Sequence, residues 1–137
     1  MAAADAVLRN CREAGIATEA LLMIGFPTET AADFDETLAF VRRNAPNITH
    51  ITASDNTYIH PGTKLLEEAF STYGVERENF HPAFWRSRGG NTLPERLRRL
   101  DALSLCAKEE GIRLDAPDEK PTLFAYEKWR KSFSSVG

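Results

Sequence analysis

A short apolar run that leads through a glycine turn into a helix constrains this chain more than any other feature. Residues 20–24, Ala-Leu-Leu-Met-Ile, form a continuous apolar segment, which is typical of a strand buried on both faces of a parallel sheet. Residues 25–27, Gly-Phe-Pro, interrupt it, and the acidic residues of segment 28–36 then favour a helix start. We expect this helix to run to about Asn44, before a proline.

A second strand is predicted at residues 48–54, with a more polar sequence than the first. The chain then passes through residues 55–60 to residues 61–63, Pro-Gly-Thr, where Thr63 is a suitable N-cap for another helix. A strand, a helix and a second strand in succession form a βαβ unit, which implies that the two strands are parallel.

Further helices are predicted from apolar residues at helical spacing. They cover residues 3–14 and 93–110, the latter opened by a capping box from Thr92 to Glu95, and a short amphipathic tail helix is expected at 122–133. Three helices are expected to end on glycines in the left-handed conformation. These are Gly15, Gly74 and Gly111.

The predicted fold class is α/β, with the order α-β-α-β-α-α and a two-stranded parallel sheet. Such a sheet leaves two edges exposed and cannot cover its helices well. We therefore interpret the chain as a fragment of a partial (βα) barrel, completed by the remainder of the barrel or by a second copy of the chain. Residues 1–114 would belong to the barrel, and residues 115–137 would form a linker and the tail helix.

Composition excludes several classes of function. The chain has 137 residues, of which 42% are hydrophobic and 27% charged, with a formal net charge of -3. These values fit a globular protein and predict neither nucleic acid nor a membrane as partner. The N-terminal residues lack the pattern of a signal peptide, so a cytoplasmic location is expected. The three histidines show no metal-ligand spacing, and no metal-binding or catalytic residues are predicted.

The glycine turn is also the candidate binding site, because ligands of α/β proteins bind at the C-terminal ends of parallel strands. Gly25 has no Cβ and would allow a ligand or another segment to approach the backbone. Phe26 and Pro27 offer a rigid apolar surface for one face of a flat ring. Glu29 could cap its own helix or accept hydrogen bonds from a ligand. A tight turn without a ligand explains the same residues.

The wider pattern resembles the radical S-adenosylmethionine (SAM) superfamily. The resemblance rests on Ala14-Gly15-Ile16, on segment 22–30 (Leu-Met-Ile-Gly-Phe-Pro-Thr-Glu-Thr), on the apolar residues that follow it, and on His60-Pro61-Gly62-Thr63-Lys64-Leu65. These segments match the fourth helix to the end of the sixth strand of the family's (βα)6 barrel. They are most similar to the branch whose members often carry an N-terminal cobalamin-binding domain. The resemblance covers residues 3–75 and is loose beyond them.

The resemblance implies that the fifth-strand motif packs beside the adenine of SAM. The positions that match it are Met23 or Ile24, Gly25, Phe26, Pro27 and Glu29, although the acid falls one residue later than in the simplest form of the motif. The end of the sixth strand would contribute polar contacts to adenine or substrate. These would come from Ser54 and Asn56, with Thr57 and Tyr58 as further candidates. Loop polar groups or strand-end caps explain these four residues equally well.

One departure from the family is large. Its chemistry requires a Cys-x-x-x-Cys-x-x-Cys motif that holds a [4Fe–4S] cluster, and this chain has only Cys11 and Cys106. The resemblance therefore implies a parent oxidoreductase or transferase that cleaves SAM reductively to a 5′-deoxyadenosyl radical, with cobalamin as an optional further cofactor. The chain alone is expected to be inactive, and its small-molecule substrate cannot be read from the sequence.

Two other hypotheses remain open at this point. One is a freestanding βαβ module that binds or scaffolds and completes its sheet by dimerisation. The other is a different β/α-barrel enzyme whose strand-end loops have a similar pattern.

Overall fold

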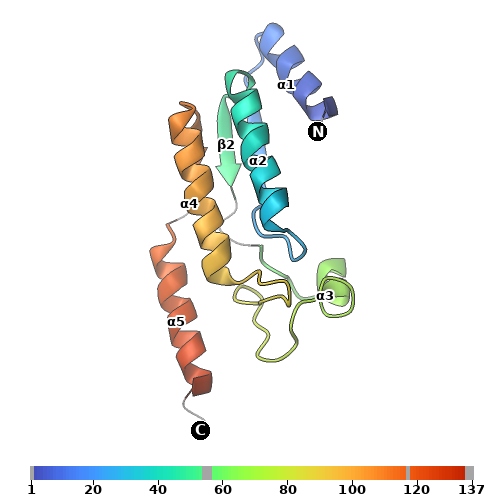
Figure 1. The fold of residues 1–137 in the computed structure, drawn as a ribbon, viewed down its shortest axis with the longest axis vertical. Coiled ribbons are helices and arrows are strands. Elements are labelled where there is room, and N and C mark those ends of the chain that lie inside the picture. Colours follow the sequence, from blue (N-terminus) through green and yellow to red (C-terminus); the bar gives the residue numbers. More distant parts are fainter. Residues whose placement is uncertain (1, 54–56, 117, 135–137) are drawn as a thin grey trace.

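The computed structural model describes residues 2–53, 57–116 and 118–134 and shows an α/β fold with its termini at opposite ends of the long axis (Figure 1). Its elements, in chain order, are α1 (Ala2–Glu13), β1 (Glu19–Leu22), α2 (Ala31–Asn44), the 3-10 helix η1 (Ala45–Asn47), β2 (His50–Ala53), α3 (Lys64–Ala69), α4 (Leu93–Glu109), β3 (Arg113–Asp115) and α5 (Lys120–Ser134).

The three strands form one parallel sheet in the order β1-β2-β3. Glu19 pairs with His50, and His50 pairs with Arg113. The prediction of two strands was therefore wrong, because β3 was taken for the end of a helix and the start of a linker. Only Leu114 in β3 is apolar, and its neighbours Arg113 and Asp115 are exposed. Such a short, polar edge strand carries no apolar run to reveal it.

One face of the sheet is covered by α2 and α4, which lie side by side over the strands (Figure 1). Both helices present apolar stripes to this face, as their sequences predict. The core formed there joins Ile51 of β2 to Val41 of α2 and Leu103 of α4, all three with no exposed surface. Ile24, just beyond β1, is 1% exposed and belongs to the same core.

The other face of the sheet has no helix over it in the described part of the chain. Leu21 is 76% exposed and Met23 is 63% exposed, and both point away from the core that contains Ile24. The prediction that segment 20–24 is buried on both faces is therefore wrong for this chain. The continuous apolar run still has a physical meaning, because it is suited to a sheet that is covered on both sides.

Several helix ends are determined by local chemistry that the sequence predicts. Thr30 is the N-cap of α2 and forms a capping box with Asp33, while Thr63 caps α3. Thr92 accepts a hydrogen bond from the backbone N–H of Glu95 at the start of α4. The predicted helix-ending glycines have positive φ. Their values are 72° at Gly15, 69° at Gly74 and 70° at Gly111.

The predicted tail helix is confirmed as α5 and is slightly longer than expected. Its residues Tyr126 and Trp129 pack on Phe84, which lies in the loop before α4. Each helix in the described ranges is too short or too polar to cross a lipid bilayer.

Candidate functional site

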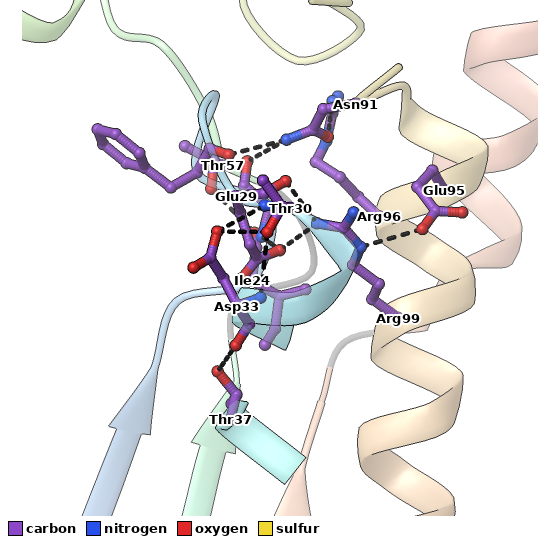
Figure 2. Close-up of polar contacts among 12 residues, drawn as sticks. Ile24, Glu29, Thr30, Asp33, Thr37, Thr57, Asn91, Glu95, Arg96 and Arg99 are labelled. Atoms are coloured by element: carbon purple, nitrogen blue, oxygen red, sulfur yellow. Dashed lines mark hydrogen bonds and ion pairs between the residues drawn. The ribbon is translucent and has the colours of Figure 1, made fainter. Parts of the chain in front are cut away.

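The glycine turn that follows β1 meets the start of α4, and a network of polar side chains joins the two (Figure 2). The turn comprises residues 23–30 and ends at the Thr30 cap of α2. It lies at the C-terminal end of β1, where the resemblance places it. The contacts below show what holds this turn in shape.

Gly25 is essential to this arrangement for two structural reasons. Its φ is +80°, a conformation that residues with a Cβ rarely adopt. A Cβ built on Gly25 would lie 2.2 Å from Cδ and 2.5 Å from Cγ of Arg96. The close approach that the missing Cβ allows is therefore used by a side chain of α4.

The backbone carbonyls of the turn accept hydrogen bonds from side chains that lie far away in the sequence. The Thr57 hydroxyl donates to the carbonyl of Ile24 at 2.9 Å. The Asn91 amide donates to the carbonyls of Gly25 and Phe26, at 3.3 and 2.8 Å. These bonds satisfy groups that would be costly to bury unpaired, and Thr57 thereby acts as a strand-end cap, one of its two predicted roles.

Glu29 is held between the turn and α4. Its Oε2 accepts a 3.0 Å hydrogen bond from the N–H of Gly25 and forms an ion pair with Arg99. The two charged side chains are 10% and 5% exposed. Arg99 also binds Glu95 one turn earlier in α4, through Nε and Oε1 at 3.0 Å. Glu29 therefore stabilises the turn and the junction with α4, in agreement with its expected capping role.

Arg96 is a buried cation beside this junction, with no exposed surface. Its guanidinium lies 4.0 Å from the centroid of the Trp85 ring and donates hydrogen bonds to the carbonyls of Trp85 and Ala83 and to the Asn91 side-chain oxygen. Burial lowers the pKa of Arg96 to about 9, so that the group remains charged at neutral pH.

The structure separates the two alternatives at the end of the first strand. Ile24 points into the core, whereas Met23 points to the open face of the sheet. Phe26 makes an edge contact with Tyr73, with ring centroids 5.3 Å apart, and Pro27 is buried at the rim of a hollow near Arg99. Ser54 and Asn56 lie outside the described residues. Of the placed candidates, Met23 has the side chain most available to a ligand.

Three residues central to this junction were not predicted from the sequence. These are Asn91, Arg96 and Arg99. A signal for Arg96 was present, because it lies three residues after Leu93 and four before Leu100, on the apolar stripe of α4. Polar residues at stripe positions are buried and need partners.

The residues of the site do not suggest a metal centre. No group of three or more metal-ligating side chains occurs within residues 2–53, 57–116 and 118–134. Cys11 is partly buried and Cys106 is buried, and both are free thiols. With two cysteines in all, the chain does not fit a [4Fe–4S] cluster by itself.

Glu95 should make the stability of this junction dependent on acid pH. Hydrogen bonds from Arg98 and then Arg99 lower the pKa of Glu95 to about 2, from 4.5. Because the folded-state pKa is the lower one, the stabilisation is complete above pH 4.5 and is lost as the pH falls towards 2. We expect a loss of about 1–2 kcal/mol over this window after solvent screening.

Urea unfolding at a series of pH values measures this effect. Glu95→Gln should show a shallower decline than the unsubstituted chain between pH 5 and 2.5, whereas Glu109→Gln, exposed at the end of the same helix, should retain the full decline. Identical slopes for all three proteins would contradict the assignment.

No protein-family model, curated protein or solved structure matches this chain at a significant level.

Proposed function

We propose that this chain is the C-terminal wall of a radical SAM enzyme barrel and that its open sheet face lines the adenine side of the SAM site. The observation that carries the proposal is a parallel sheet covered by helices on one face only. In a β/α barrel, helices surround the strands and the uncovered face points inward. The sequence resemblance over residues 3–75 supplies the family.

The open face has the chemistry of a barrel interior near its binding end. Leu21, Met23 and Thr52 surround an apolar hollow of about 350 Å³ together with Leu22 and Ala53. A hollow of this kind suits the face of a flat ring, since ligand sites are mostly apolar with few polar groups. Exposed apolar residues gathered in one place also indicate a surface that is covered in the functional protein.

The contacts of the turn restrict how SAM would be held. The Cα of Gly25 already faces Arg96, and the carbonyls of residues 24–26 already accept hydrogen bonds from Thr57 and Asn91. We therefore assign the adenine contact to the side chain of Met23 on the open face. Glu29 and Arg99 would act by holding the turn in position.

A longer reading frame is the first test of this proposal. The cluster would be bound by strands upstream of residue 1, so the coding sequence should continue in frame and contain a three-cysteine motif. The encoded polypeptide, purified without oxygen and loaded with iron and sulfide, should form 5′-deoxyadenosine from SAM and dithionite. A closed frame without the motif, or a loaded protein that leaves SAM intact, would refute the proposal.

A substitution at Met23 tests the assignment of the open face. In that longer polypeptide, Met23→Asp should weaken SAM binding at least tenfold, because a carboxylate would replace an apolar contact with the ring. Val7→Asp is the matched control, since Val7 is 59% exposed on α1, away from the open face. Equal SAM affinity of the two variants, measured by equilibrium dialysis, would contradict the role of Met23.

A freestanding module that dimerises is the second candidate, and the same exposed apolar residues favour it. In that case Leu21 and Met23 would be covered by a second copy of the chain. Sedimentation equilibrium of the 137-residue chain distinguishes the two proposals. A dimer that Leu21→Asp converts to a monomer supports the module, and a monomer at all concentrations excludes it.

A further inference from the structure

A second hollow lies between α5 and the loop of residues 76–92, separate from the open sheet face. Its volume is about 220 Å³. Figure 1 shows α5 beyond the sheet, next to the start of α4, so that this hollow is built from the C-terminal part of the chain. Protein interiors seldom contain voids much larger than a water molecule, and a cavity of about 150 Å³ is large enough for benzene. The hollow can therefore hold a small ring compound.

Aromatic side chains form most of its apolar wall. Phe80 and Phe84 contribute from the loop, and Tyr126, Trp129 and Phe133 contribute from α5. The rings of Trp129 and Phe133 meet edge to face at 5.2 Å, and Trp129 and Tyr126 lie 5.8 Å from each other. Rings arranged in this way offer both faces and edges to a further ring, which aromatic pairs prefer.

The polar part of the wall contains charges of both signs. Glu76 and Arg86 form an ion pair with each other and are thereby neutralised. Glu78 and Arg130 also line the hollow, and both side chains are exposed to solvent. Neither forms an ion pair or hydrogen bond within residues 2–53, 57–116 and 118–134. One negative and one positive group thus remain available beside an aromatic wall.

We propose that this hollow binds a small aromatic zwitterion of the kind represented by a free aromatic amino acid. The ring occupies the space between Phe84 and Phe133, the ammonium group faces Glu78, and the carboxylate faces Arg130. A purely anionic or cationic ring compound leaves one of these two charges unmatched, whereas the zwitterion complements both. The inference does not depend on the SAM site, because every residue named here belongs to this chain.

A series of indole compounds tests the ring and the two charges separately. Binding to the ¹⁵N-labelled full chain is followed by NMR shifts at residues 76–92 and 120–133. Tryptophan should bind with a dissociation constant on the order of millimolar. It should bind more tightly than indole-3-acetate and tryptamine, each of which carries one charge, and these more tightly than indole. An equal response to all four compounds, or none, overturns the proposal.

Charge variants identify which residue faces which group. Arg130→Gln should weaken tryptophan and indole-3-acetate about three- to fivefold and leave tryptamine unchanged. Glu78→Gln should weaken tryptophan and tryptamine by the same factor and leave indole-3-acetate unchanged. Glu127→Gln and Lys128→Gln are matched controls on α5, since neither residue lines the hollow. Loss of affinity without this pattern overturns the orientation and with it the zwitterion.

The aromatic wall has its own test that leaves folding intact. Phe133 is 44% exposed at the edge of the hollow, so Phe133→Ala should reduce the affinity for all four compounds without unfolding the chain. Phe124→Ala is the control, because Phe124 is 74% exposed on the same helix and does not line the hollow. Unchanged binding by Phe133→Ala would show that the ring lies elsewhere.

Discussion

Arg99→Met is expected to lower the free energy of unfolding by about 3–5 kcal/mol, because it removes one partner of a buried ion pair. Glu29 would remain at the end of the turn with its carboxylate largely buried and its strongest partner gone. Methionine is chosen because it fills much of the volume of arginine and keeps the contact with the Phe34 ring. Urea unfolding at pH 7 measures the loss.

Two variants show whether the buried charge is the cause. Arg98→Met removes the same side chain one position earlier in α4, where it is 63% exposed and pairs with Glu95, so its cost should stay below about 1 kcal/mol. In the double variant Glu29→Gln/Arg99→Met, the uncompensated carboxylate is absent and part of the stability should return. Equal losses for Arg98→Met and Arg99→Met would contradict the role given to the buried pair.

Gly25→Ala is expected to destabilise the chain by about 2–4 kcal/mol, from left-handed strain and overpacking together. The methyl group would collide with the stem of Arg96 rather than with its flexible end. That stem cannot move aside easily, since the guanidinium is held by Trp85 and Asn91. Thermal and urea unfolding both report the change.

Gly111→Ala provides the matched control for this prediction. Gly111 has a φ of +70°, close to that of Gly25, but a Cβ there would meet nothing within 4 Å. Its cost should therefore be the strain alone, about 1–2 kcal/mol. In the Arg96→Ala background, Gly25→Ala should cost no more than this strain. An undiminished cost in that background would show that Arg96 is not what requires a glycine.

Both predictions concern residues that hold the glycine turn against α4, and they change how the turn is understood. From the sequence, Gly25 and Glu29 were candidates for contact with a ligand. In the structure, Gly25 accommodates Arg96, and Glu29 binds Gly25 and Arg99. The ligand contact is thereby narrowed to Met23, on the side of the strand that faces away from α4.

The sequence by itself was sufficient for features whose causes lie within a few residues. Thr30 and Thr63 cap their helices through N–H groups three residues away, and the glycine endings depend on a single residue with positive φ. Apolar spacing placed the helices and the first two strands, because one helix turn or one strand pleat repeats over short distances.

Only the tertiary structure decided what depends on residues far apart. Glu29 and Arg99 are separated by 70 positions, and Gly25 and Asn91 by 66. Strand β3 has one apolar residue and forms because β2 offers it an edge with which to pair. The open face likewise has no local signature, since whether Leu21 and Met23 are covered depends on which segments pack over the sheet. Burial and long-range pairing are properties of the assembled chain, and local propensity contains no record of them.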